Sequence, residues 1–133
     1  MLYLLDTDTC SYIMKRTHPQ LLSKLRGVDP EHLAVSVVTE AELLYGVRLS
    51  PLQKRAQTAF DEFIKHVRVL NWDRGAAEHY ADIRAYLKKK GEMIGANDLM
   101  IAAHGRSLEA TVITNNQREF RRVQKLRVEN WSI

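Results

Sequence analysis

The sequence contains a single cysteine, Cys10, which excludes an internal disulfide and is typical of a protein folded in a reducing cytoplasm. No apolar stretch approaches the roughly 20 residues that a membrane-spanning helix needs. No basic segment precedes the short apolar run at the amino terminus, so a signal peptide is not expected. Repeats, low-complexity tracts and Gly/Ser-rich linkers are also lacking. A chain of 133 residues without such linkers predicts one domain over residues 1–133.

Several well-known catalytic signatures are missing as well. There is no P-loop and no GxGxxG loop for binding phosphates, and the five histidines show no HExxH-like metal spacing. His104 follows Asp98 by six positions, nearly opposite on a helix, so we expect it to be structural or exposed. Trp72 and Trp131 are expected to pack against the core, with base stacking as the alternative.

Basic residues exceed acidic ones only modestly, with 20 lysines and arginines against 16 aspartates and glutamates and an isoelectric point near 9.3. This excess permits an anionic partner such as nucleic acid without requiring one. The basic residues cluster at the end of a predicted helix and near the carboxyl end of the chain. Such runs are usually solvated helix faces, but these could also guide an RNA backbone. The residues assigned to RNA binding are Lys88, Lys89, Lys90, Arg118, Arg121 and Arg122.

Short apolar runs alternate with segments of helical periodicity along the whole chain. Strands are predicted at residues 1–5, 33–37, 68–70, 111–114 and 126–129. Helices are predicted at 9–15, 20–26, 39–49, around 60–67, 73–91, from about 97 past 105, and 116–120. This alternation predicts an α/β domain with a mostly parallel central sheet and right-handed crossovers.

Carboxylates occupy the positions where such a fold binds ligands. Asp6 and Asp8 follow the first predicted strand, and the carboxyl ends of strands form the ligand-binding edge of open α/β sheets. Glu42 and Asp98 lie near predicted helix starts, Glu42 in a capping box with Thr39. Carboxylates that converge repel one another and lose solvation, so a convergent set would need a divalent cation.

Each acid also has a purely structural interpretation. Asp6 could end a strand in a turn, Asp8 could cap the next helix, and Glu42 could serve the capping box alone. Asp98 could be a favourable charge at a helix amino terminus. Gly46, one turn beyond Glu42, costs about 1 kcal/mol in a helix interior, which suggests a need for space there.

Four segments in order, LLDTDTCSYIMK, SVVTEAELLYG, IGANDLMIAAHG and VITNNQREF, resemble the signature stretches of PIN-domain ribonucleases, most closely the VapC toxins of bacterial toxin–antitoxin pairs. The resemblance implies a three-layer α/β/α fold. It implies a homodimeric endoribonuclease that depends on Mg²⁺ or Mn²⁺ and is silenced by a cognate antitoxin, with DNA bound only through that antitoxin. The implied substrate is structured RNA, with the anticodon loop of a tRNA as the best candidate and initiator tRNA as the first tRNA to consider.

By position in these motifs, Asp6, Glu42 and Asp98 match the family's metal-binding acids. Asn116 falls where many members carry a fourth aspartate, and an uncharged amide oxygen is a weaker metal ligand; we include it in the catalytic set, orienting water or phosphate. The residues assigned a supporting role are Thr7, Asp8 and Thr114.

The resemblance implies attack of a metal-activated water on the phosphodiester, leaving a 5′-phosphate and a 3′-hydroxyl. Two alternatives remain open. The segment around Asp6 also resembles the first motif of haloacid-dehalogenase-like phosphatases, in which the first aspartate is the nucleophile, but the later lysine and paired acids of that family are not evident. In the other alternative the protein is a non-catalytic interaction module whose acids only cap helices.

Overall fold

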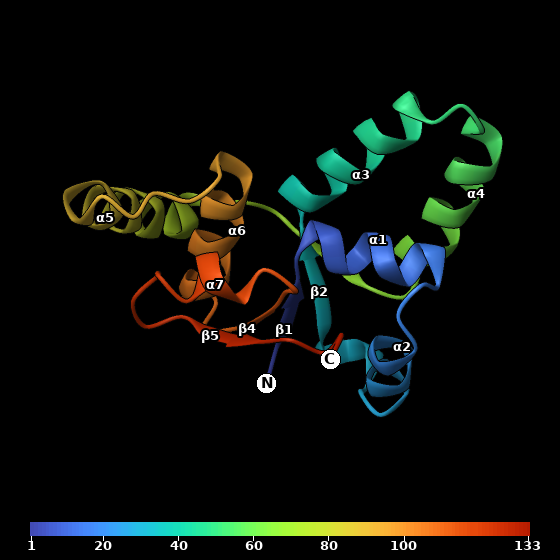
Figure 1. Cartoon of the computed structure of the whole chain (residues 1–133), viewed down its shortest axis with the longest axis horizontal. Coiled ribbons are helices and arrows are strands. Elements are labelled where there is room, and N and C mark those ends of the chain that lie inside the picture. The colour runs from blue at the N-terminus through green and yellow to red at the C-terminus, as the bar shows by residue number, and fades with distance from the viewer.

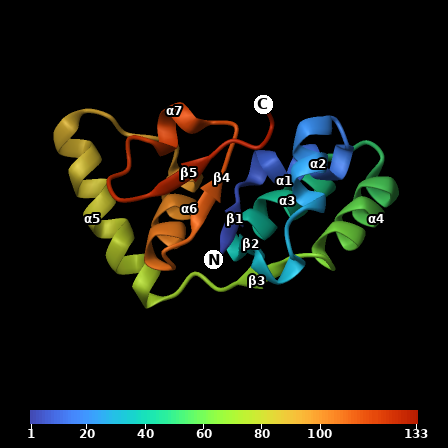
Figure 2. The same ribbon diagram turned by 90° about the horizontal axis from the view of Figure 1, so that it is seen from below.

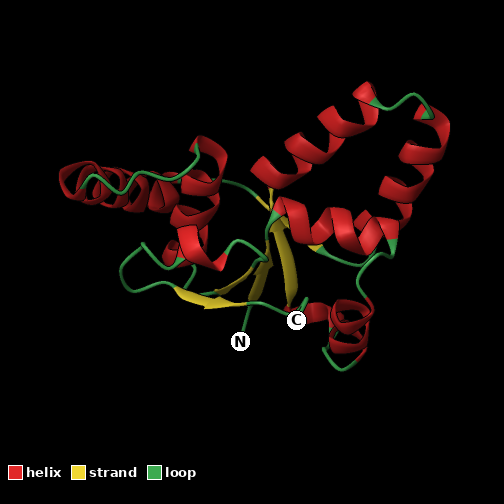
Figure 3. Ribbon diagram, viewed as in Figure 1, coloured by secondary structure: helices red, strands yellow, loops and turns green.

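The computed structural model describes residues 1–133, in which strands and helices alternate as the sequence predicts (Figure 3). The strands are β1 (Tyr3–Leu5), β2 (Leu33–Ser36), β3 (Arg68–Leu70), β4 (Thr111–Ile113) and β5 (Arg127–Glu129). The helices are α1 (Thr7–Lys15), α2 (Pro19–Arg26), α3 (Val37–Leu49), α4 (Gln53–Ile64), α5 (Arg74–Lys90), α6 (Ala96–Ser107) and α7 (Gln117–Phe120), with a 3-10 turn at Pro30–His32. None of these helices has the combination of length and apolar character that crossing a bilayer requires.

All five strands are parallel and lie in the order β3-β2-β1-β4-β5. The chain steps outward from β1 to β3 and then returns to β4 on the other side of β1. Helices α1 to α4 consequently lie on one side of the sheet, and α5 to α7 on the other (Figures 1 and 2). The predicted three-layer α/β/α architecture is confirmed. In such sheets the crevice for ligands opens at the carboxyl ends of the strands, at the point where the strand order reverses. Here that point lies between β1 and β4, and we call it the β1–β4 edge.

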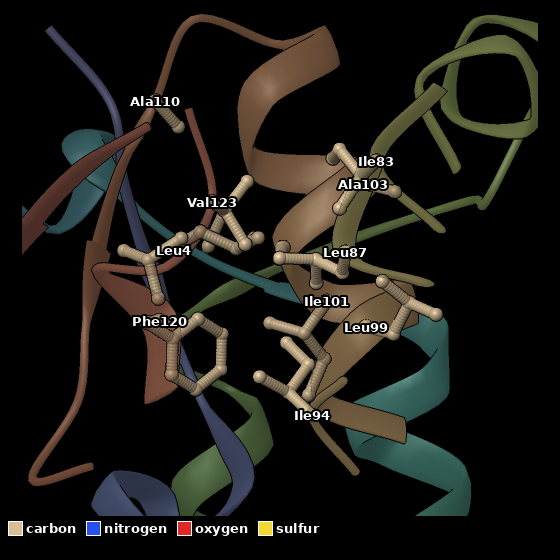
Figure 4. Packing of buried hydrophobic residues seen from close by; sticks show 13 residues of the cluster. Leu4, Ile83, Leu87, Ile94, Leu99, Ile101, Ala103, Ala110, Phe120 and Val123 are labelled. Carbon is tan, nitrogen blue, oxygen red and sulfur yellow. The ribbon is translucent and has the colours of Figure 1, made fainter. Parts of the chain in front are cut away.

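Neighbouring residues of one strand belong to different cores, because successive side chains of a strand point to opposite faces. Leu5 of β1 packs in the cluster under α1 to α4, whereas Leu4 packs in the cluster under α5 and α6. Figure 4 shows the second cluster, in which Phe120 lies beside Leu4 and Ile101 beside Leu87. Strands that are apolar on both faces are typical of a parallel sheet covered on both sides.

Three helices begin clearly earlier than the sequence suggested, and one of them, α4, predicted around 60–67, spans Gln53–Ile64. Helix α1 begins at Thr7 and is capped by Asp6, whose Oδ1 accepts the Thr9 backbone N–H at 2.9 Å, so the predicted start at Thr9 was wrong. Helix α3 begins at Val37, because Ser36 caps it by accepting the Val38 N–H.

The predicted capping box of Thr39 and Glu42 was therefore wrong too. Ser36 ends β2 and is itself a good cap, so the helix starts there and buries Thr39 completely. Glu42 becomes the sixth residue of α3, and its carboxylate is free to meet partners from other elements.

Three residues that the sequence predicts to be structural, His104, Trp72 and Trp131, pack inside the protein. His104 is buried, its Nδ1 has no hydrogen-bond partner, and burial lowers its pKa. Trp72 donates its indole N–H to the Met100 carbonyl at 3.0 Å. Trp131 is buried with its ring 4.9 Å from that of Tyr3. Trp72 is partly buried and packs against the cluster that contains Leu4.

Two mid-helix glycines are expected to respond oppositely to alanine. A Cβ at Gly105 of α6 would lie 2.7 Å from Val112 Cγ2, a rigid buried methyl group, so Gly105→Ala is expected to lower the free energy of unfolding by about 1–3 kcal/mol. A Cβ at Gly46 of α3 meets nothing within 4 Å, so Gly46→Ala is expected to raise it by about 0.5–1 kcal/mol. Urea denaturation of both variants measures this, and a stable Gly105→Ala protein would contradict the packing of α6 on β4.

Candidate active site

Asp6 forms the buried floor of the candidate site. It follows β1 directly, is 2 % exposed, and its carboxylate is held by the Thr9 N–H and by the Thr114 hydroxyl. These hydrogen bonds favour the charged form, but burial outweighs them and raises the pKa of Asp6. Thr114, just after β4, thus supports Asp6 across the β1–β4 edge, and its Oγ1 also accepts the Asn116 N–H at 2.8 Å.

Glu42 reaches the same region from α3. Its Oε1 accepts the Thr7 hydroxyl, and its Oε2 accepts the Asn97 amide N–H at 2.9 Å. Thr7 begins α1, directly after Asp6, and Asn97 precedes Asp98 in the first turn of α6. The structure therefore joins the segments of all three predicted metal-binding acids.

Asp98 shows most clearly that the acids gather. Its pKa is raised to about 6, first by burial and then by the negative charges of four other carboxylates. In decreasing order of effect these are Asp6, Glu119, Asp8 and Glu42. Asp98 lies in the first turn of α6, where the helix dipole favours a negative charge, so burial and repulsion must outweigh that benefit.

Sequence reasoning missed Glu119. It lies on α7, three residues after Asn116, and accepts a hydrogen bond from the Asn116 side-chain amide. The same amide lies 3.5 Å from Asp98 Oδ2. Asn116 thus stands between two carboxylates, and Glu119 brings a negative charge close to the position that the motif comparison assigned to a fourth aspartate. The signal was present, since Glu119 belongs to the fourth motif.

No basic side chain neutralises this cluster. The one ion pair in the whole structure joins Lys65 and Glu62 on the surface. As these side chains stand, no three Asp, Glu, His or Cys groups form a ready-made ion site, so binding an ion between the carboxylates requires some of them to change rotamer. Carboxylate oxygens of Glu42 and Glu119 accept hydrogen bonds from the side chains of Thr7, Asn97 and Asn116.

A pocket of about 390 Å³ opens above these groups. It is lined by Thr7, Asp8, Glu42, Gly95, Ala96, Asn97 and Asp98. Asp8 is exposed in this lining and does not cap α1, a role that Asp6 fills. The pocket offers carboxylate oxygens as metal ligands, contains no histidine or cysteine, and carries excess negative charge. These properties fit a hard divalent cation such as Mg²⁺ or Mn²⁺.

The predicted RNA-binding residues fall into two groups. Lys88, Lys89 and Lys90 form the exposed last turn of α5, and Arg118 and Arg121 are exposed on and just after α7. Arg122 is different, because its guanidinium donates to the carbonyls of Glu92 and Met93 and ties down the loop that leads into α6.

The comparisons with known proteins agree with this arrangement. The PIN-domain family profile matches residues 3–126. The chain is 39 % identical over 129 residues to Ribonuclease VapC2 of Haemophilus influenzae, covering 97 % of each chain. It is 37 % identical over 130 residues to the tRNA(fMet)-specific endonuclease VapC of Shigella flexneri, covering 98 % of each. The chain belongs to the VapC branch of the PIN-domain family.

Solved structures show the same relationship. DNA-bound VapBC from Salmonella typhimurium superposes with a TM-score of 0.92 at 36 % identity, covering 98 % of this chain and 99 % of that one. VapBC2 from Rickettsia felis, bound to a promoter DNA fragment, gives a TM-score of 0.90 at 32 % identity with the same coverage. The predicted family and fold are confirmed.

Neither alternative function is favoured. A phosphatase nucleophile must reach its substrate, whereas Asp6 is buried and caps α1. A module whose acids only cap helices is not supported either, because Glu42 caps nothing and Asp98 lies in a cleft among like charges.

Asp98 is expected to reduce stability at neutral pH when no cation is bound. Because its folded pKa of about 6 exceeds the ordinary 3.8, the folded protein holds this proton more tightly than the unfolded chain does. The resulting stabilisation is complete below about pH 4 and disappears as the pH rises through 6. Asp98→Asn should thus raise the free energy of unfolding at pH 7 in EDTA by about 1 kcal/mol, after allowance for solvent screening of this half-exposed group.

Urea denaturation of Asp98→Asn and wild type between pH 4 and 7.5 isolates this contribution. The difference in free energy of unfolding between the two proteins should grow with pH. His104 has the opposite pH dependence, but both proteins contain it, so its contribution cancels in the difference. Asp82→Asn, an exposed change on α5, is the matched control. A difference that is flat across this range would contradict the repulsion in the cleft.

Proposed function

We propose that this protein is a metal-dependent endoribonuclease toxin that cleaves structured RNA. The observation that carries the proposal is the crowding of Asp98 by four carboxylates at the β1–β4 edge, with no basic side chain to offset them. A fold that maintains such repulsion loses stability unless something positive binds there. The ribonuclease names of the relatives support RNA as the substrate.

Asp6, Glu42 and Asp98 would hold a Mg²⁺ or Mn²⁺ ion, with Glu119 as the fourth acid. Such an ion activates water and offsets charge on the scissile phosphate. Asp98, which lines the pocket, would also be placed to accept a proton from the attacking water. The water oxygen would attack phosphorus in line, the bond to the 3′-oxygen would break, and the leaving 3′-oxygen would take a proton from solvent, giving a 5′-phosphate and a 3′-hydroxyl.

Asn116 acts through its neighbours in this proposal. Its amide donates to Glu119 and lies near Asp98, so it orients these carboxylates without supplying positive charge. Asp6, below them, is oriented by Thr114 and Thr9. Asp8 and Thr7 complete the pocket wall.

Basic side chains on α5 and α7 would hold the RNA backbone. Lys88 to Lys90 and the two exposed arginines Arg118 and Arg121 lie on elements that flank the loop entering α6. Because the Shigella flexneri relative is named a tRNA(fMet)-specific endonuclease, we propose an anticodon loop, that of initiator tRNA first, as the substrate.

The partners are proposed from the solved relatives, which are VapBC complexes. A cognate antitoxin would dock in the apolar groove of about 540 Å³ between α1, α2 and α4, which is lined mainly by hydrophobic residues such as Leu22, Leu25 and Phe63. DNA would be bound only through that antitoxin. A homodimer in the cytoplasm completes the proposal, and the exposed Tyr45 and Leu49 of α3 provide apolar surface that a second copy could cover.

The proposal is tested by incubating purified protein with initiator tRNA and with an unrelated structured RNA. Cleavage is expected with Mg²⁺ or Mn²⁺ and not in EDTA, and end-group analysis should find 5′-phosphates and 3′-hydroxyls. Asp6→Asn, Asp98→Asn and Glu119→Gln should each reduce the cleavage rate by at least about 100-fold, because each removes a negative charge from the ion's site.

Circular dichroism checks that the inactive variants are folded, and Asp82→Asn, outside the cleft, is the matched charge-removal control. Cutting that persists in EDTA, or 2′,3′-cyclic phosphate ends, would refute the mechanism. An active Asp98→Asn protein would show that the site is misplaced.

A further inference from the structure

Glu42 differs from the other acids of the cleft in how it is supported. Asp6 follows a strand, and Asp98 lies in the first turn of a helix, so the backbone places each of them. Glu42 projects from the sixth residue of α3 on a longer and more flexible side chain. Such a side chain stays in one place only when other groups hold it.

The groups that hold Glu42 come from the immediate neighbours of the other two acids. Thr7 donates to Oε1 and follows Asp6, whereas Asn97 donates to Oε2 and precedes Asp98. The two contacts bridge 35 and 55 positions of sequence. One carboxylate is thereby aligned with two backbone segments at once, each of which carries one of the other candidate ligands.

Both donors are uncharged, which matters for a cation site. A lysine or arginine in either place would hold Glu42 but also cancel its charge and compete with the ion. A hydroxyl and an amide orient the carboxylate and leave its charge intact. Buried Thr39 supports the arrangement, since its hydroxyl lies 3.2 Å from that of Thr7.

We propose that Asn97, together with Thr7, is a positioning residue that sets the Glu42 carboxylate for the divalent cation. This inference rests on the proposed function and adds to it a residue that the family comparison did not single out. Asn97 itself is not a ligand here, because its side chain donates through nitrogen. Since Asn97 is exposed, removing its amide leaves no buried hole and should not unfold the protein.

The test is a titration of full-length protein with Mn²⁺, in which electron paramagnetic resonance measures the fraction of Mn²⁺ bound. Asn97→Ala and Thr7→Val should each weaken Mn²⁺ binding by about 10- to 100-fold, the usual effect of removing a group that orients a metal ligand. Thr7→Ser keeps the hydroxyl and should bind within about threefold of wild type. The urea midpoint in EDTA should change little in Asn97→Ala, which separates positioning from folding.

Gln57→Ala is the matched control, because Gln57 also donates a side-chain amide to a carboxylate, that of Asp61, at 2.9 Å on exposed α4. It should leave Mn²⁺ binding unchanged. Tight wild-type binding that survives undiminished in both Asn97→Ala and Thr7→Val would overturn this inference alone. Folded wild type with no saturable Mn²⁺ binding would overturn the proposed function and this inference with it.

Discussion

Repulsion among carboxylates at the β1–β4 edge is the constraint around which the rest of the structure is arranged. Five acids from four parts of the chain are brought within electrostatic reach of one another, and none has a basic partner. Burial strengthens this repulsion, because charges interact more strongly where water is excluded. A packed α/β sandwich can carry this strain only because apolar layers on both faces of the sheet hold the strands in place.

The topology explains why the acids meet at that edge. Sheet order reverses at β1, so α1 and α3 approach the carboxyl ends of the strands from one face and α6 and α7 from the other. Asp6, Glu42, Asp98 and Glu119 each come from an element that ends or begins there. Uncharged donors hydrogen-bond to Glu42 and Glu119, and the carboxylates share a cleft without forming a ready-made ion site.

Much of this arrangement could be predicted from the sequence, because it depends on local signals. Apolar runs gave the strands, Gly91 correctly ended α5, and Asp6 and Asp98 were recognised from their places next to a strand and a helix start. The alternation of strands and helices was enough to predict a parallel sheet with two covered faces.

What could not be predicted depends on competition and on contacts distant in sequence. Ser36 and Thr39 are both good helix caps, and only the end of β2 decides for Ser36. The contact between Asn97 and Glu42 joins residues 55 positions apart, which no spacing rule reveals. Glu119 lies in the fourth motif, but only its contact with Asn116 in the folded protein shows that it belongs to the cleft.

Mn²⁺ anomalous diffraction tests most directly the proposal that a divalent cation binds between these carboxylates. Crystals grown with Mn²⁺ should show an anomalous peak within about 2.0–2.6 Å of carboxylate oxygens of Asp6 and Asp98, with Glu42 close by. Well-ordered crystals in which the cleft shows no such peak, or in which Mn²⁺ binds only elsewhere, would contradict the account.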